Sequence, residues 1–187
     1  MTVSAELDRR FREAAASEGL LDVAYDLADT PIGHVLLASS ERGLCRISYD
    51  PEPERELEEL ARGLGARVLR APPALDLVRR QLDEYFDGSR HSFDLDVDVE
   101  RLSPYNRRVL AALTRVPYGQ VTTYGKLAAE TGRPRAARAV GSYMRRNPIP
   151  IVLPCHRVIG SSGSLVGYAG GLDRKEKLLR LEGALLT

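Results

Sequence analysis

Residues 147–158 read NPIPIVLPCHRV, an apolar run that ends at a proline and is followed at once by a cysteine, a histidine and an arginine. The short apolar segment 151–153 predicts a buried strand. Pro154 has no amide proton and should end that strand. In a regular strand, Cys155 and His156 would point to opposite faces, so the two can cooperate only if the backbone turns here. We therefore expect a turn at Pro154 that presents Cys155 just beyond a rigid apolar element.

Cys155 has the surroundings of a reactive thiol. A free cysteine has a pKa near ~8.5, and a neighbouring imidazolium or cationic side chain lowers it. The plain alternative is a small buried apolar residue, which is the usual role of a cytosolic cysteine. The basic neighbours His156 and Arg157 favour a nucleophile instead. Glu182 comes at the end of the last predicted helix, where the helix dipole disfavours an acid. We expect it to have a specific partner, and pairing with His156 would give a Cys–His–Glu arrangement.

The composition limits the class of protein. The chain has 187 residues, enough for one large or two small domains. Its two cysteines form no Cys-x-x-Cys and its three histidines lie far apart, which excludes the usual structural zinc spacings. We expect no metal and no cofactor. No apolar run approaches ~18 residues and no signal peptide is visible, so we expect no membrane span and a reducing, cytoplasmic setting.

The net charge of +1 hides a strong asymmetry. Residues 1–100 carry 12 Lys and Arg and 22 Asp and Glu, a formal charge of −10. Residues 101–187 carry 15 Lys and Arg and 4 Asp and Glu, a formal charge of +11. Two domains that attract each other would explain the opposite signs. A polyanionic partner for the second half would also explain why the basic half carries the thiol. The change of sign places a domain boundary near residue 100.

The first half predicts a small antiparallel sheet with helices. A helix over 4–16 is expected to turn Leu7, Phe11 and Ala14 inward. Its other expected elements are strands over 21–28, 34–38, 44–49 and 67–70 and helices over 51–65 and 73–87. Residues 93–99 alternate apolar and acidic side chains. That alternation resembles a set of metal ligands, but period two is typical of a half-buried strand, which we favour.

The second half predicts mainly helices. Ser103 should cap a helix that runs to about residue 115, and Thr123 should cap a helix over 124–130. After a break at Thr131-Gly132-Arg133-Pro134, a further helix covers 135–146. Two short helices across a glycine-bearing turn are typical of a helix-turn-helix. A last helix should begin with Asp173 as its cap and end near Glu182.

The helix over 135–146 has a nearly bare face, formed by small residues around Arg138. Small side chains allow a backbone to approach a groove closely, and an arginine there can contact phosphate or enter the base stack. Tight packing against another helix would explain the small residues equally well. The surrounding cations favour nucleic acid: Arg133, Arg135, Arg145 and Arg146.

The residues quoted so far resemble one family. The run PCHRV at 154–158, preceded by Asn147-Pro148 and followed by GYAGGL at 167–172, resembles the O6-alkylguanine-DNA alkyltransferases, or methylated-DNA–protein-cysteine methyltransferases. PYGQVTTYG at 117–125 and RAVG at 138–141 match as well. The resemblance is dense from about 103 to 183 and weaker before. It implies an α+β fold. Residues 1–100 would form an N-terminal ribonuclease-H-like domain with a small antiparallel sheet and helices. Residues 101–187 would form a mostly helical DNA-binding and catalytic domain with the helix-turn-helix and the active-site loop.

The resemblance implies direct DNA repair by a protein that acts once. The alkyl group of O6-alkylguanine in double-stranded DNA, with O4-alkylthymine as a further candidate, would move irreversibly to Cys155 after the base is flipped through the minor groove. His156 would deprotonate the thiol through a water, and Glu182 would orient His156. Asn147 would hold the turn, and Tyr124 would rotate the nucleotide outward and donate to the leaving base.

The same resemblance implies the remaining sites. Arg138 would fill the gap left in the base stack. The other residues implied in DNA binding are Ala137, Ala139, Gly141 and Tyr124. The residues implied in the substrate pocket are Met144, Pro150, Val158, Tyr168, Ala169 and Lys175. It implies no cofactor and no membrane partner. We expect a monomer in solution and leave cooperative assembly on DNA open.

The sequence departs from the family pattern in two places. Residues 105–110 read YNRRVL where many members have Phe-Gln-x-x-Val-Trp, and we interpret these as packing positions. The N-terminal metal ligands of some members have no counterpart. Two alternatives stay open. A non-catalytic sensor of alkylated DNA would leave Cys155 unmodified, and a cysteine hydrolase using Cys155, His156 and Glu182 would turn over repeatedly.

Overall fold

The computed structural model describes residues 4–185 and confirms a mixed α+β fold. The described chain divides into two compact units. The first unit comprises residues up to 84 together with 94–98, and the second comprises residues 85–93 together with the chain from 99 onward. The short segment 85–93 therefore groups with the second unit, although it precedes the last strand-like segment of the first.

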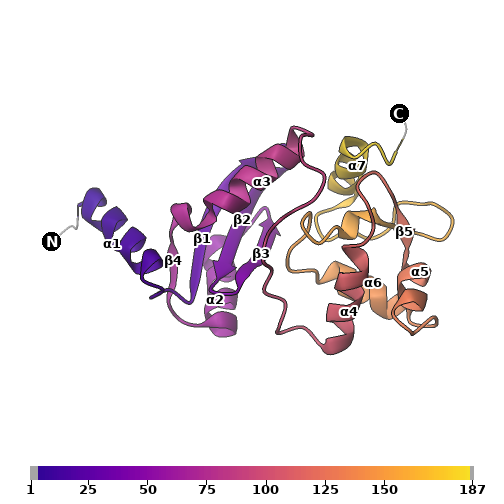
Figure 1. Ribbon diagram of the computed structural model, residues 1–187, viewed down its shortest axis with the longest axis horizontal. Coiled ribbons are helices and arrows are strands. Elements are labelled where there is room, and N and C mark those ends of the chain that lie inside the picture. The colour runs from indigo at the N-terminus through magenta and orange to yellow at the C-terminus, as the bar shows by residue number, and fades with distance from the viewer. Residues whose placement is uncertain (1–3, 186–187) are drawn as a thin grey trace. The chain divides into compact units, whose positions relative to one another are not determined.

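The first unit is built on a four-stranded sheet with the order β3-β2-β1-β4 (Figure 1). Its elements are α1 (Ala5–Ser17), β1 (Val23–Thr30), β2 (Gly33–Ser40), β3 (Gly43–Tyr49), α2 (Pro53–Leu64), β4 (Val68–Arg70), the 3-10 helix η1 (Pro72–Leu75) and α3 (Asp76–Phe86). β1, β2 and β3 form the predicted antiparallel meander, and β4 pairs parallel to β1. Cys45 lies among the buried apolar side chains of this unit.

Two expectations for the first unit are wrong. Leu7 and Phe11 do not turn inward, because 59% and 64% of their surfaces are exposed, and Ala14 is exposed as well. Residues 93–99 form no regular strand. Their backbone meets β3 only around Leu44, whose amide donates to the Asp96 carbonyl at 2.9 Å and whose carbonyl accepts from the Asp98 amide at 2.8 Å. The alternating sequence therefore gives an extended segment with one bridge.

Among its described residues, the second unit holds four α-helices of its own. Its elements are α4 (Pro104–Leu113), β5 (Thr122–Thr123), α5 (Tyr124–Glu130), α6 (Ala137–Arg145), the 3-10 helix η2 (Cys155–Arg157), β6 (Val158–Ile159) and α7 (Leu172–Leu181). Two predicted caps are present, since the Ser103 hydroxyl accepts from the Asn106 amide and the Thr123 hydroxyl from the Lys126 amide. The third is not, because Gly171 occupies the N-cap of α7 and Asp173 lies in its first turn.

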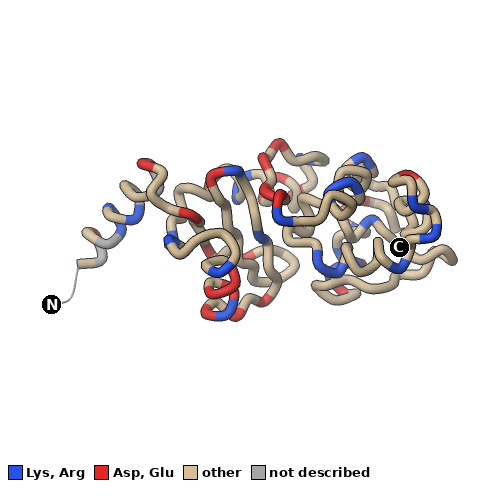
Figure 2. The backbone as a smooth tube through the Cα atoms, turned by 90° about the horizontal axis from the view of Figure 1, so that it is seen from below, with Lys and Arg blue, Asp and Glu red and all other residues tan. Residues whose placement is uncertain are grey.

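Charge is unevenly spread over the chain. Figure 2 shows Lys and Arg distributed over the second unit, whereas acidic residues are concentrated in the first. Within residues 4–185, no helix has both the length and the apolar character needed to cross a membrane. The same described residues bring no three His, Cys, Asp or Glu side chains into a group that could hold a metal ion.

Candidate active site

The turn around Cys155 is tighter than the sequence predicts. The segment 151–153 is buried but forms turns instead of a strand, and Ile151 has a positive φ of 73°. Asn147 holds this turn from within: its side-chain nitrogen donates to the Leu153 carbonyl at 2.7 Å, and its oxygen accepts from the Ile149 amide at 3.1 Å. Prolines and the Asn147 bonds together favour a closed turn over the extended backbone that the apolar run alone suggests.

η2 begins at Cys155 and carries the predicted Cys–His pair. Because a 3-10 helix advances three residues per turn, Cys155, His156 and Arg157 point in different directions from one turn. All three side chains are buried. Burial raises the pKa of the Cys155 thiol to about 11, and a hydrogen bond from Asn147 counteracts only part of that rise. The resting thiol is therefore protonated and needs a base before it can act as a nucleophile.

His156 lies against Glu182, at the C-terminal end of α7. Its Nε2 is 2.8 Å from Glu182 Oε1, and both side chains are fully buried. Burial raises the pKa of Glu182, but hydrogen bonds from His156 and Arg157 outweigh it and lower the pKa to about 2. The carboxylate is thus ionised and can only accept, so we assign the proton of neutral His156 to Nε2. Nδ1, which is buried without a hydrogen-bond partner, then carries a free lone pair.

Three further groups that sequence reasoning missed hold Glu182. Arg157 donates from Nε to Oε2 and from Nη2 to Oε1, each at 2.9 Å. The Gly119 amide lies 3.3 Å from Oε2, and the Tyr85 hydroxyl donates to Oε1 at 2.7 Å. Arg157 could have been found from its place in the PCHRV run, and Gly119 from its turn. Tyr85 carried no signal, because it lies 97 residues from Glu182 along the chain.

Lys175 is a buried cation whose charge interacts with the Cys155 thiol. Its side chain is fully buried, and its Nζ donates to the Val158 carbonyl at 2.6 Å and the Val166 carbonyl at 2.8 Å. Burial lowers the pKa of Lys175 to about 8, while the charge of a Cys155 thiolate would raise it. A proton at Lys175 and a negative charge at Cys155 therefore stabilise each other.

Tyr124 connects the helix pair to the loop that precedes α7. Its hydroxyl donates to the Val166 carbonyl at 3.1 Å and is 3.4 Å from the Gly167 carbonyl. Burial raises the pKa of Tyr124, and the charge of Cys155 raises it further. Tyr124 is thus a protonated donor whose hydroxyl interacts electrostatically with the charge at the thiol.

Two adjoining hollows open on α5 and α6. Their volumes are about 480 Å³ and 420 Å³, and Tyr124, Arg138 and Gly141 line both. A Cβ on Gly141 would lie 3.8 Å from the Tyr124 ring, so the small residue allows the ring to lie close against α6. Arg138 is exposed, and Ala137 lines the smaller hollow. Four of the five residues implied in DNA binding therefore meet at one place, whereas Ala139 lines neither hollow.

The residues expected in the substrate pocket differ in burial. Met144, Pro150 and Val158 are buried, Tyr168 is half-buried and Ala169 is exposed. None of these five lines the two hollows on α5 and α6.

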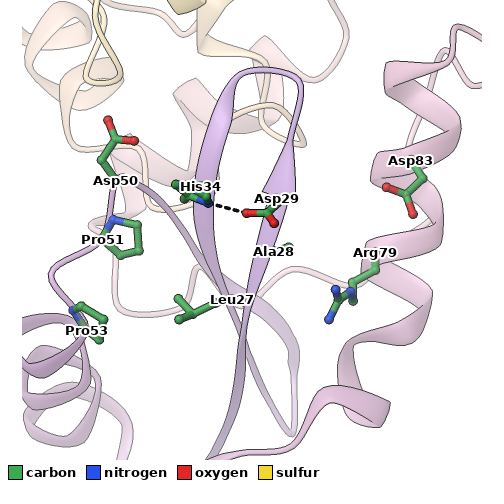
Figure 3. A pocket seen from close by; sticks show the side chains of 9 residues that line it. All are labelled: Leu27, Ala28, Asp29, His34, Asp50, Pro51, Pro53, Arg79 and Asp83. Carbon is green, nitrogen blue, oxygen red and sulfur yellow. Dashed lines mark hydrogen bonds and ion pairs between the residues drawn. The ribbon is translucent and has the colours of Figure 1, made fainter.

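The first unit has a hollow of its own, shown in Figure 3, with a volume of about 820 Å³. It is lined by Leu27, Ala28, Asp29, His34, Asp50, Pro51, Pro53, Arg79 and Asp83. His34 pairs with Asp29 across its rim, and Arg79 pairs with the buried carboxylate of Asp26. No residue predicted for chemistry or DNA binding lines it.

Comparison with known proteins finds a matching family model in each half of the chain. The family model described as the DNA binding domain of 6-O-methylguanine DNA methyltransferase matches residues 104–184. The model described as the ribonuclease-like domain of the same protein matches residues 23–99. The matched regions include Cys155, His156 and Glu182 in the one and Tyr85 in the other.

Individual relatives agree with the family models. The methylated-DNA–protein-cysteine methyltransferase of Methanosarcina barkeri is 44% identical over 158 residues, which cover 84% of this chain and 96% of the relative. That of Mycobacterium tuberculosis is 40% identical over 160 residues, covering 86% and 92%. Among solved structures, the Mycobacterium tuberculosis OGT in complex with DNA has a TM-score of 0.76 at 38% identity, covering 86% of this chain and 93% of that one. The chain therefore belongs to the 6-O-methylguanine DNA methyltransferase family, whose relatives named here are methylated-DNA–protein-cysteine methyltransferases, a class of transferases.

Proposed function

We propose that this protein repairs double-stranded DNA by moving an alkyl group from O6-alkylguanine to Cys155, once per molecule. The observation that carries the proposal is a buried thiol followed directly by a histidine whose Nε2 is fixed on Glu182 and whose Nδ1 has no protein partner. Such a histidine is ready to accept a proton at Nδ1. The names of the related proteins support DNA as the partner and the methyl group as the cargo.

The proposed step is a displacement at the alkyl carbon. The Cys155 proton passes to His156 Nδ1, through a water, as the sulfur attacks. A new S–C bond forms while the C–O bond breaks, and the electron pair of the broken bond stays with O6 of guanine. Attack at an alkyl carbon favours a soft, polarisable nucleophile, and a thiolate has these properties. The thioether product has no easy leaving group, so the protein is consumed.

The leaving guanine gains negative charge that must be neutralised. Tyr124 is the proposed donor, since burial and Cys155 keep its hydroxyl protonated. Lys175 is the proposed electrostatic partner for the developing charge, because its ammonium is buried and interacts electrostatically with Cys155. Charge stabilisation of this kind is strongest in a site that excludes water. Met144, Pro150, Val158, Tyr168 and Ala169 remain the proposed lining for the base.

Access to the base requires flipping, because a buried thiol such as Cys155 cannot reach the alkyl carbon while the base stays stacked in the duplex. The α5–α6 face offers the parts for it. Arg138 is exposed between the two hollows, and Ala137, Ala139 and Gly141 leave α6 without bulky side chains around it. We propose that this face enters the minor groove and that Arg138 occupies the space vacated by the base, which offsets an unstacking cost of a few kcal/mol.

Intact-mass measurement tests the proposal. The protein is incubated with a short duplex that contains one O6-methylguanine, and Cys155→Ala serves as the control. The expected result is one added methyl group, mapped to Cys155 and saturating at one per protein. Binding to the duplex without any change in mass would contradict repair and favour a sensor. Continued turnover of an ester substrate would favour the hydrolase.

A further inference from the structure

Tyr85 lies near the end of α3, before the mainly helical residues 101–187, but its side chain reaches the carboxylate of Glu182. Its ring is fully buried, and its hydroxyl lies 2.7 Å from Glu182 Oε1. The structure buries Tyr85 completely and the neighbouring Phe86 only in part. A buried tyrosine hydroxyl requires a partner, and here that partner is the carboxylate which also binds His156.

The ring of Tyr85 is fixed by other aromatic side chains of the second unit. Its centroid lies 5.4 Å from that of Phe86, 5.3 Å from that of Phe93 and 6.0 Å from that of Tyr118. Packing of this kind holds the hydroxyl in place without help from the carboxylate. The hydroxyl can therefore be removed while the ring stays where it is.

One oxygen of Glu182 is shared by three donors. Oε1 accepts from the Tyr85 hydroxyl at 2.7 Å, from His156 Nε2 at 2.8 Å and from Arg157 Nη2 at 2.9 Å. An oxygen has two lone pairs, so the three donors compete for its electron density. Each hydrogen bond that Tyr85 or Arg157 makes to this oxygen leaves less negative charge to stabilise a proton on the imidazole.

We propose that Tyr85 is a positioning residue for the His156–Glu182 pair, and that its hydroxyl weakens the pull of the carboxylate so that His156 rests in the neutral form that can accept the thiol proton. The proposal rests on the proposed function, in which His156 is the base for Cys155. It adds a residue from the region matched by the ribonuclease-like family model to a site that otherwise lies in the DNA-binding region.

The charges around His156 agree with this role. The titratable and charged groups that face His156 or its carboxylate are Cys155, Arg157, Lys175, Glu182, Tyr85 and Tyr118. Burial is the main cause that lowers the pKa of His156, Glu182 opposes it, and the cations Arg157 and Lys175 lower the pKa further. Burial and Glu182 both raise the pKa of Tyr85, so its hydroxyl stays a donor at every working pH.

The test compares Tyr85→Phe with Tyr118→Phe in the full chain. Tyr118 is a matched control because its ring lies in the same aromatic cluster while its hydroxyl donates to the Leu181 carbonyl at 2.9 Å and not to the carboxylate. Titration of His156 is followed by NMR on protein labelled at histidine, and the rate of alkyl transfer from free O6-benzylguanine is measured across pH. Thermal unfolding verifies that both variants fold.

Tyr85→Phe is expected to increase the proton affinity of His156 by about three- to tenfold, since a bond to a charged oxygen is lost. The midpoint of the acid side of the pH–rate profile should move to higher pH in step with the NMR midpoint. Tyr118→Phe should move neither midpoint. The proposal is overturned if Tyr85→Phe leaves both midpoints in place, including the case where it lowers the rate equally at all pH values. It is also overturned if Tyr118→Phe moves them as far.

The NMR titration and the rate measurement together separate this inference from the function on which it rests. The NMR titration needs no reaction, so it decides whether the hydroxyl tunes His156 even in a protein that transfers nothing. Absence of transfer by the unaltered protein at every pH would overturn the proposed function instead.

Discussion

The surroundings of Glu182 and the α5–α6 face belong to the same unit but are built on opposite principles. Glu182 is buried, and four residues donate hydrogen bonds to its two oxygens: His156, Arg157, Tyr85 and Gly119. The α5–α6 face is open, with Arg138 exposed between two hollows. The first region fixes one carboxylate in one position, whereas the second leaves the Arg138 side chain exposed to meet another molecule.

The difference fits the role that we propose for each region. Proton transfer needs a base held within hydrogen-bonding reach and kept in one protonation state, which buried and fully paired groups provide. Contact with a DNA backbone needs charge and close approach, which exposed arginines and small residues provide. Chemistry and DNA binding should therefore respond to separate substitutions.

The largest effect is expected at the thiol. Cys155→Ser should abolish alkyl transfer both from duplex DNA and from free O6-benzylguanine, because a hydroxyl is a far weaker nucleophile at carbon. Binding of the variant to duplex DNA should stay within about twofold of the original, because Cys155 is buried and lines neither hollow on α5 and α6. Single-turnover kinetics and a filter-binding titration check the two halves of this prediction.

A smaller loss of rate is expected when the carboxylate charge is removed. Glu182→Gln should slow transfer from the free base by about 10²- to 10⁴-fold, as for loss of general-base assistance. The buried Arg157 would lose its counter-charge, so circular dichroism must verify that the variant folds. A folded variant with an unchanged rate on the free base would remove Glu182 from the chemistry.

Two glycines allow a sharper comparison, because an added Cβ would approach Glu182 at Gly119 but would meet nothing at Gly132. Gly119 has a φ of 74°, and an added Cβ would lie 2.9 Å from the Glu182 carbonyl oxygen. Gly132, in the turn between α5 and α6, has a φ of 79° with nothing within 4 Å of an added Cβ. Both alanine variants should lose about 1–2 kcal/mol of stability from backbone strain alone.

Only Gly119→Ala should lose more stability than that and also slow transfer from the free base, because its methyl group would displace Glu182. Thermal unfolding and single-turnover kinetics measure both. Equal losses for the two glycines would show that the close approach to Glu182 has no consequence.

The smallest effect on chemistry is expected on the open face. Arg138→Ala should weaken binding to duplex DNA by about tenfold and reduce the salt dependence by about one phosphate contact. Arg180→Ala is a suitable control, because Arg180 is an exposed arginine paired with Glu176 on α7. If both variants weakened binding equally, net charge and not position would explain the effect of Arg138.

Local signals in the sequence predicted the parts of the fold that depend on neighbouring residues. The caps Ser103 and Thr123 begin their helices as expected, and turn residues correctly separate the three strands of the meander. Predictions failed where the apolar pattern alone was used, because it reveals neither specific side-chain hydrogen bonds nor the surface against which a helix packs. The apolar segment 151–153 is buried but bent, because hydrogen bonds from Asn147 stabilise turns there. Leu7 and Phe11 have helical spacing, but more than half of the surface of each is exposed.

The candidate site shows the same division. The PCHRV run and an acid placed against the helix dipole were enough to predict the pairing of His156 with Glu182, next in sequence to Cys155. The donors that complete the site could not be predicted in this way. Tyr85 comes from the other half of the sequence, and Gly119 contributes a backbone amide, which has no signature in the residue type.

The separation of chemistry from DNA binding is tested most directly by the ratio of two rates of alkyl transfer, the rate from duplex DNA and the rate from the free base. The rate of alkyl transfer is measured for Arg138→Ala and for Glu182→Gln, each with a duplex that contains O6-benzylguanine and with the free base. Arg138→Ala should lose rate on the duplex and keep it on the free base, whereas Glu182→Gln should lose about the same factor on both. Loss of rate on the free base by Arg138→Ala, equal to its loss on the duplex, would contradict the division of the molecule into a buried chemical region and an open DNA-binding face.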